Sequence, residues 1–282
     1  MKERNKPITE LLLRLQGMDV SKYDDIFLNK ILQKRIAETH CESEKDYYTL
    51  LTQNSKEIKL FGDSLQISYS EFFRNSLSFA VLEHILLPSL ASRKLKNKSK
   101  EIRIWSAACA SGQEAYSLAI LLEEFKQNYS EAFNYRIFAT DQSETQLSIA
   151  RIGQYEKSAL NFMTMKRINQ WFIKQGNIYS IKPELKEKID FSFFDLLNEQ
   201  IASPSVSIYG DFDLVVSANL LFYYKPEYRK IILNKISNAL DEDGFLVCGE
   251  TERDICMKYN LKEIFPHSAI FSKDLFHKAF KL

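Results

Sequence analysis

The stretch that decides the fold is Arg103-Ile-Trp-Ser-Ala-Ala-Cys-Ala-Ser-Gly-Gln-Glu-Ala-Tyr-Ser117. It predicts a buried strand, a loop of small residues and the start of a helix. Small side chains let a ligand approach a loop backbone closely, and those of this loop are Ala107, Ala108, Ala110 and Gly112. Glu114 adds a carboxylate in the first turn of the helix. Loops of this kind also occur for packing alone, so the loop needs support from other segments.

A second strand over residues 135–140 ends in Asp141. An acid at that strand tip of an open α/β sheet is placed to bind a ribose diol. The G-x-G-x-x-G fingerprint, which serves a pyrophosphate, is absent because Gly112 is the loop's one glycine. The pattern therefore predicts a nucleoside ligand without phosphates, and S-adenosylmethionine (SAM), a sulfonium cation, is such a ligand.

Strands and helices alternate through the second part of the chain. The pattern predicts strands over 102–107, 135–140, 212–217 and 244–249, and helices over 113–126, 143–152 and 226–240. This order indicates an α/β fold with a doubly wound and mostly parallel sheet. Strands over 177–182 and 188–194 break the alternation and are expected to form a small antiparallel excursion.

The N-terminal part is expected to be wholly helical. Helices are predicted over 7–16, ended by Gly17, over 23–39, and from a capping-box-like start at Ser43 and Asp46. A further long helix over 70–96 should break at Pro88, and the basic stretch 94–100 is either a surface linker or a binding patch. We expect a helical domain at 1–68, an interdomain helix and linker at 69–100, and an α/β domain at 101–282.

Composition limits the function. The net charge of +1 over 282 residues gives no field for nucleic acid or membranes. No run of about 18 apolar residues and no signal peptide is visible, so a cytoplasmic protein is expected. The cysteines and histidines show no metal-ligand, disulfide or catalytic-triad spacing, and Cys109 is expected to be a packing residue rather than a nucleophile. These residues are Cys41, Cys109, Cys248 and Cys256, and His40, His84, His267 and His277.

The ordered segments resemble the CheR-type chemotaxis receptor methyltransferases. The segments that carry the resemblance are Ser70-Glu-Phe-Phe-Arg74, residues 104–117, Ala139-Thr-Asp141, Ala150-Arg-Ile-Gly-Gln-Tyr155 and Ala218-Asn-Leu-Leu-Phe-Tyr223. The resemblance covers nearly the whole chain. It implies a protein-glutamate O-methyltransferase that uses SAM, releases S-adenosylhomocysteine and forms glutamyl methyl esters on the acidic helical cytoplasmic domain of chemotaxis receptors. It also implies a small antiparallel β-subdomain inserted at about 165–194, which in some members docks a receptor C-terminal peptide.

The resemblance also assigns residues, position by position. It implies cofactor contacts at Ser68, Ser70, Arg74, Glu114, Asp141, Asp195, Leu196 and Asn219, and catalytic roles for Arg74 and Tyr223. No general base is needed, because an acceptor glutamate is already ionised at neutral pH. The catalytic contribution would be mainly proximity and orientation. Lys30, Lys34 and Arg35 could present a basic face to the receptor, or simply form a solvated helix face.

Each site residue also has an ordinary structural interpretation. Glu114 could complement a helix N-terminus, and Asp141 could cap a helix in competition with Ser143. Arg74 could pair with a surface acid, Asn219 could cap the next helix, and Tyr223 could be a core aromatic. The order of the segments favours function for Asp141, Arg74 and Asn219.

The chain departs from the family pattern at several positions. It has Ala108, Ala110, Ala115, Asp195 and Ala218 where the family usually has glycine, a small polar residue, proline, asparagine and arginine. The extra methyl group of Ala108 is tolerable only if its φ is negative. These departures motivate an alternative, a non-catalytic SAM- or S-adenosylhomocysteine-binding regulatory module of the same fold. A small-molecule methyltransferase is disfavoured, since the helical N-terminal domain would then have no task.

Overall fold

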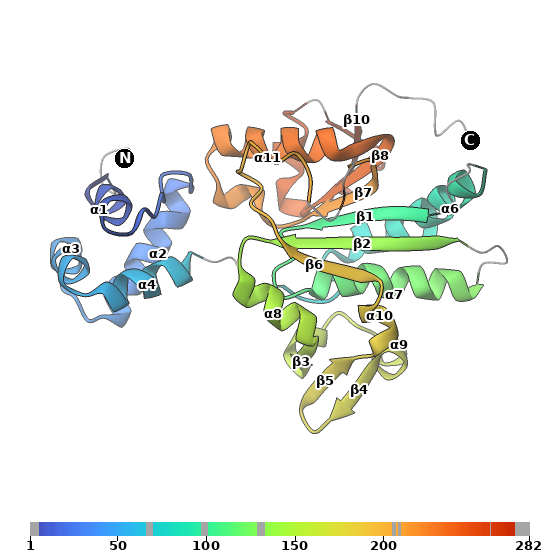
Figure 1. The fold of residues 1–282 in the computed structure, drawn as a ribbon, viewed down its shortest axis with the longest axis horizontal. Helices are drawn as coiled ribbons and strands as arrows, with labels where there is room; N and C mark the ends of the chain where they lie inside the picture. Colours follow the sequence, from blue (N-terminus) through green and yellow to red (C-terminus); the bar gives the residue numbers. More distant parts are fainter. Residues whose placement is uncertain are drawn as a thin grey trace. The chain divides into compact units, whose positions relative to one another are not determined.

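The computed structural model describes residues 6–65, 70–96, 101–128, 133–204, 207, 210–259 and 261–273 (Figure 1). Its contacts divide the chain into two compact units. The first comprises Met1–Ile67 and Leu220–Arg229, and the second comprises Ser68–Asn219 and Lys230–Leu282. Within the described ranges, every helix is too short or too polar to cross a bilayer.

The first unit is helical, as the sequence predicts. It contains α1 (Lys6–Gln16), α2 (Asp25–Glu38), α3 (Glu44–Gln53) and α4 (Ser55–Ser64). Gly17 follows α1 with a φ of +64°, and the Ser43 hydroxyl caps α3 by accepting the Asp46 N–H. A segment distant in sequence joins this unit. The 3₁₀ helix η3 (Leu221–Tyr223) accepts the Asp24 N–H at the Tyr223 carbonyl, at 2.8 Å.

A buried ion pair joins two helices of the first unit. It removes Arg35 from the basic face that the sequence predicted. Arg35 is 8% exposed and donates both Nε and Nη2 to the Glu57 carboxylate, at 2.9 and 2.6 Å. The Tyr47 hydroxyl donates to the same carboxylate at 2.7 Å. Arg35 therefore holds α2 to α4 and is not available to a receptor, whereas Lys30 and Lys34 are exposed.

The second unit is built on a seven-stranded sheet of order β6-β2-β1-β7-β8-β10-β9 (Figure 1). The first five strands in that order are parallel, while β10 runs antiparallel to both of its neighbours. The fold-class prediction is thus confirmed. The bounds are β1 (Glu101–Ala107), β2 (Asn134–Asp141), β6 (Ile189–Phe193), β7 (Phe212–Ser217), β8 (Leu240–Cys248), β9 (Leu261–Glu263) and β10 (Ile270–Lys273).

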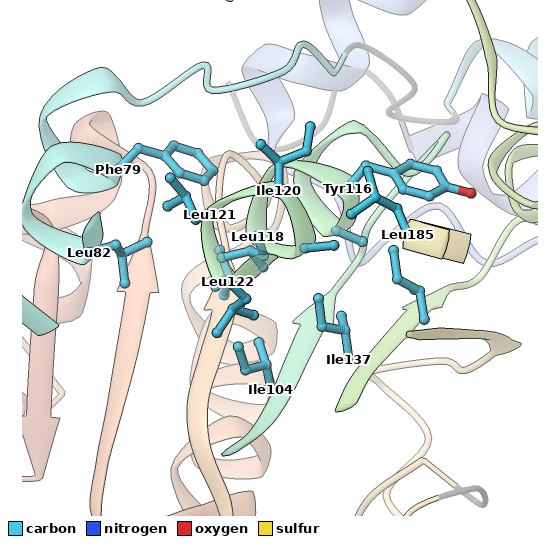
Figure 2. Packing of buried hydrophobic residues seen from close by; sticks show 14 of the residues in the cluster. Phe79, Leu82, Ile104, Tyr116, Leu118, Ile120, Leu121, Leu122, Ile137 and Leu185 are labelled. Carbon is cyan, nitrogen blue, oxygen red and sulfur yellow. The ribbon is translucent and has the colours of Figure 1, made fainter. Parts of the chain in front are cut away.

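Helices cover both faces of this sheet, with α7 (Gln113–Asn128) and α8 (Glu144–Ile152) on one side and α11 (Pro226–Ala239) on the other (Figure 1). Figure 2 shows Leu118 and Leu122 of α7 over Ile104 of β1 and Ile137 of β2. All four side chains are at most 2% exposed. This apolar contact fixes the position of α7 against the sheet. It therefore also fixes the position of the loop that precedes α7.

A three-stranded antiparallel sheet of order β3-β5-β4 spans residues 154–181, so it begins before the insertion expected at about 165–194. Its strands are β3 (Gln154–Glu156), β4 (Phe172–Gln175) and β5 (Ile178–Ile181), and the short helices η2 (Lys157–Leu160), α9 (Met165–Trp171) and α10 (Pro183–Lys186) accompany them. One part of the expected excursion was wrong. The strand predicted over 188–194 is β6, which pairs in parallel with β2 from Ile137↔Ile189 to Asp141↔Phe193.

The long helix predicted over 70–96 differs from the observed structure in two respects, its start and the expected break at Pro88. Residues 70–75 are not helical. The helix then runs through α5 (Ser76–Val81), a π-helical turn η1 (Leu82–Leu86) and α6 (Leu87–Lys96), so Pro88 does not break it. Proline lacks the N–H that an α-helix would donate four residues back and its ring crowds that carbonyl. The wider π turn, in which the Leu87 N–H reaches the Leu82 carbonyl, accommodates both effects.

The basic stretch at 94–100 is partly structural. Lys94 lies in α6 and its ammonium group contacts the Asp213 carboxylate at 2.9 Å, as does the Arg93 guanidinium. Asp213 is fully buried on β7 and also accepts the Arg103 N–H. These bonds compensate a buried charge. Residues 97–100 lie outside the described ranges.

Candidate functional site

The carboxyl ends of the parallel strands bring several predicted residues to one edge of the sheet. Glu114 follows β1, Asp141 ends β2, Asp195 follows β6 and Asn219 follows β7. The order of strands reverses direction beside β1, which has β2 on one side and β7 on the other. Open α/β sheets bind ligands outside the carboxyl ends of their strands at such a reversal. The topology therefore places these side chains where a ligand site is expected.

The loop after β1 has an unusual backbone. Ala108 has a φ of +64° and Ala110 a φ of +48°, so the expectation of a negative φ at Ala108 was wrong. Gly112 has a φ of +91°, and a Cβ there would lie 2.9 Å from the Cβ of Ala150 on α8. Strain of this kind persists only where the surroundings impose it, and it concentrates at functional sites. Here the Cys109 N–H donates to the Thr140 carbonyl at 2.9 Å and ties the loop to β2.

Replacing Ala108 by glycine should stabilise the protein. A left-handed alanine costs about 1–2 kcal/mol, of which glycine's greater freedom in the unfolded chain offsets about half. We expect Ala108→Gly to raise the free energy of unfolding by roughly 0.5–1 kcal/mol, measured by urea denaturation. Ala107→Gly in β1 is the matched control and should lower it by a similar amount. A lower free energy of unfolding in Ala108→Gly would contradict the interpretation that the backbone at Ala108 is strained.

Asp141 faces the loop. Its Oδ2 accepts the Ala110 N–H at 2.9 Å and its Oδ1 accepts the Ser143 N–H at 2.8 Å. Burial raises the pKa of Asp141 above its ordinary value, although these N–H groups favour the ionised form. Asp141 does not cap α8, because Ser143 occupies the cap position and accepts the Gln146 N–H. A carboxylate has about four acceptor sites, so Asp141 can accept a further donor such as a ribose hydroxyl in addition to backbone N–H groups.

Glu114 lies in the first turn of α7 and accepts a hydrogen bond from the Ser106 hydroxyl of β1 at 2.7 Å. Burial raises the pKa of Glu114 to about 7; the Ser106 hydrogen bond lowers it and the Glu252 carboxylate raises it. A carboxylate that is costly to ionise becomes a good partner for a cation, which removes that cost. The surroundings of Glu114 therefore suit a cationic ligand, in addition to the favourable interaction of an acid with a helix N-terminus.

The segment from Ser70 to Arg74 is anchored beside the first turns of α7. The Phe73 N–H donates to the Ser117 hydroxyl at 3.0 Å, and that hydroxyl donates to the Gln113 carbonyl. Phe73 has a φ of +54°, and the Arg167 guanidinium of α9 lies 4.6 Å from the centre of its ring. Ser70 and Arg74 are both half-buried. Ser68 lies outside the described residues.

The insertion supports the same segment and the loop. The Phe72 ring packs edge-on against Tyr155 of β3 and Phe172 of β4, with ring centroids 4.9 and 5.3 Å apart. The Tyr155 hydroxyl donates to the Ser111 carbonyl in the loop after β1, at 2.7 Å. The small sheet and the loop of small residues are thus in direct contact.

The remaining predicted residues have distinct surroundings. Asp195 accepts the Leu197 N–H at 2.9 Å in a local turn, and Leu196 is 8% exposed. Asn219 has a φ of +62° and donates its N–H to Glu252 at 2.8 Å. The helix that Asn219 was expected to cap, α11, begins only at Pro226, and the cap position of the intervening η3 is held by Leu220.

Tyr223 belongs to the first unit. Its ring packs edge-on against Phe27 of α2, with centroids 4.8 Å apart. The neighbouring Tyr224 stacks on Tyr23 at 5.3 Å. The segment that carries Tyr223 therefore makes its contacts with the helical unit, which its position in the sequence, between β7 and α11, does not indicate.

Sequence reasoning missed three supporting residues, Ser117, Arg167 and Glu252. Arg167 is held by Glu83 and Glu124, each at 2.8 Å. Glu252 stands three residues after Gly249, a spacing typical of a capping box, and this was the available signal. No signal in the sequence connects Arg167 or Ser117 with Phe73, because those contacts join distant segments.

Other chemistry is poorly supported at this edge. Burial raises the pKa of the Cys109 thiol well above its ordinary value, which disfavours the reactive thiolate form. Among the residues that the structure describes, no group of three or more His, Cys, Asp and Glu side chains is arranged to hold a metal ion.

Comparison with known proteins agrees with this geometry. Residues 68–268 match the family model described as CheR methyltransferase, SAM binding domain. The chain is 28% identical over 256 residues to the chemotaxis protein methyltransferase of Borreliella burgdorferi, covering 89% of this chain and 87% of that one. It is 32% identical over 205 residues to chemotaxis protein methyltransferase 1 of Pseudomonas aeruginosa, covering 71% and 72%.

SAM is therefore the cofactor, and the residues present suit it. SAM carries positive charge on its sulfonium and amino groups, and the edge of the sheet offers the carboxylates of Glu114 and Asp141. The Asp141 carboxylate is an acceptor of the kind that a ribose hydroxyl needs, and the small loop side chains leave the backbone accessible.

Proposed function

Since the chain belongs to the CheR methyltransferase family, we propose that it methylates glutamate side chains on the cytoplasmic helices of chemotaxis receptors. The observation that carries this proposal is the convergence of Glu114, Asp141 and Asn219, residues of three separate matching segments, at one edge of the sheet. The names of the relatives support a role in chemotaxis. The glutamate acceptor and the receptor are the finer parts of the proposal.

The proposed mechanism relies on positioning. Bound SAM would supply an electrophilic methyl group for a carboxylate oxygen, and S-adenosylhomocysteine would be the leaving group, keeping the electron pair of the broken carbon–sulfur bond. Asp141 would hold the ribose and Glu114 the cationic part of the cofactor. Arg74 would bind the cofactor or the incoming carboxylate by charge-assisted hydrogen bonds, and Tyr223 would orient the acceptor. Because the acceptor carboxylate is already ionised, no residue of the chain has to remove a proton.

The test is transfer of a radiolabelled methyl group from SAM to purified receptor cytoplasmic fragments. We expect base-labile label on the fragment, lost when its acceptor glutamates are replaced by alanine. Arg74→Ala should reduce the rate by about 100-fold or more, as expected when a charge-assisted contact to the reacting groups is removed. Absence of label from protein that binds SAM would contradict the proposal.

A second function keeps one specific observation in its favour. The loop after β1 holds Ala108 and Ala110 in left-handed conformations, and Ala218 stands where the resembled family has an arginine. A protein that only binds SAM or S-adenosylhomocysteine and regulates a partner would tolerate such departures. It would give bound cofactor without ester in the same assay, so one experiment separates the two functions.

A further inference from the structure

Glu252 is a buried acid at the same edge of the sheet as the proposed cofactor contacts. It is fully buried in the 3₁₀ helix η4 (Glu250–Glu252), which follows β8. Its Oε2 accepts the N–H of Gly249 and the N–H of Asn219, both at 2.8 Å. Gly249 follows β8 and Asn219 lies just beyond β7, its parallel neighbour. One carboxylate oxygen therefore bridges the ends of two adjacent strands.

The hydrogen bond between the Asn219 N–H and Glu252 stabilises an unfavourable backbone conformation of Asn219. Asn219 has a φ of +62°, a conformation that persists when surrounding bonds impose it. Gly249 completes the arrangement, because a Cβ there would lie 2.9 Å from the Asn219 nitrogen and 3.0 Å from the Asn219 Oδ1. The missing side chain of Gly249 and the carboxylate of Glu252 thus together define where Asn219 can lie.

We propose that Glu252 is a positioning residue of the SAM site, which holds Asn219 in the conformation that meets the cofactor. The inference rests on the proposed contact between Asn219 and SAM. Glu252 acts through the backbone of Asn219, so its role is positional and not catalytic. Because both N–H groups bind one oxygen, the role needs an acceptor atom at that place and does not need the negative charge.

Three substitutions of Glu252 distinguish the need for an acceptor oxygen at this position from the need for a negative charge. Glu252→Gln keeps an oxygen at the required distance and removes the charge. Glu252→Asp keeps the charge but is one methylene too short, and Glu252→Ala removes the acceptor. The dissociation constant of SAM is measured by calorimetry at pH 8, where Glu114 is ionised in all variants. We expect Glu252→Gln to stay within about threefold of the native protein, and Glu252→Asp and Glu252→Ala to bind at least about tenfold more weakly.

The control is Asp213→Asn, which changes a second fully buried acid near the amino end of β7, the strand that leads to Asn219. It should lower the melting temperature and leave the dissociation constant of SAM unchanged. Native affinity in folded Glu252→Asp or Glu252→Ala would overturn the proposal, as would a loss in Glu252→Gln equal to that in Glu252→Ala.

Asn219→Ala distinguishes a failure of the positioning role of Glu252 from a failure of the proposed contact between Asn219 and SAM. Weakened binding in Asn219→Ala together with native binding in Glu252→Asp would refute only the positioning role. Native binding in Asn219→Ala would refute the contact on which the role rests. Both readouts are independent of methyl transfer, so they stand whether or not receptor glutamates are the acceptors.

Discussion

We expect Asp141→Ala to abolish the thermal stabilisation that SAM gives to the native protein. A ligand present at about 100 times its dissociation constant stabilises the folded state by about 2.7 kcal/mol, which raises the melting temperature of a domain of this size by roughly 5–10 °C. Asp141 supplies the acceptor at the tip of β2, and its loss also releases the Ala110 N–H that shapes the loop. Differential scanning fluorimetry with and without SAM measures the effect.

Ser143→Ala is the matched control for this experiment. It lies two residues away and removes the cap of α8, which should cost about 1 kcal/mol of stability. Because the Ser143 N–H is retained, Asp141 keeps its contact and the shift with SAM should remain. A full SAM shift in Asp141→Ala would show that the acid does not bind the cofactor, and the proposed site would have to be abandoned.

The affinity for SAM should rise with pH through about 7. Burial holds the Glu114 pKa near 7 from its ordinary value of 4.5, so below pH 7 the carboxyl is mostly protonated and must lose its proton to meet a cation. The dissociation constant should then increase by up to about tenfold for each pH unit below 7 and level off above it. Calorimetry in buffers of different ionisation enthalpy should detect proton release near pH 6.

Glu114→Gln isolates this effect from the titration of SAM itself. Glutamine preserves the shape and can still accept from Ser106, so this variant should lack the component of the pH dependence that Glu114 causes. At pH 8 it should bind more weakly than the native protein. Identical pH profiles for the two proteins would disprove the assignment of Glu114.

The same shift has a consequence for stability without ligand. Between pH 4.5 and 7 the folded protein keeps a proton on Glu114 that the unfolded chain has lost. The contribution of this group to stability therefore decreases as the pH rises through that window and is constant above it. Above pH 7 the ionised Glu114 carboxylate therefore lowers the stability of the free protein, and a bound cation would reduce this cost.

Much of the fold follows from local patterns. Apolar runs located β1, β2 and β7, and helical patterns located α7, α8 and α11, to within a few residues. The strands read as runs because parallel strands inside a sheet are buried on both faces. The predicted helix was wrong at 70–75, and the strand predicted over 188–194 is present but pairs in parallel with β2. A strand's partner and a segment's departure from helix depend on contacts made elsewhere, such as the bond from the Phe73 N–H to Ser117 and the pairing of β6 with β2.

The candidate site divides in the same way. Glu114 and Asp141 were predicted from residue type and position after a strand, since a parallel sheet sends the ends of its strands to one edge. Asn219 was predicted from the resemblance to the CheR family. The structure added the positive φ of Ala108, the buried role of Arg35, the raised pKa of Glu114 and the bridging carboxylate of Glu252. These properties arise from burial and from groups distant along the chain.

The amino-acid sequence by itself determined the class of fold, the strand ends that carry the polar residues and a nucleoside ligand without phosphates. Those features depend on side-chain size, charge and short-range spacing, which are visible in any stretch of about fifteen residues. Only the tertiary structure decided the register of the sheet, the membership of the Tyr223 segment in the helical unit and the support of Asn219 by Glu252. Long-range packing and desolvation set these, and neither is a property of a local stretch of chain.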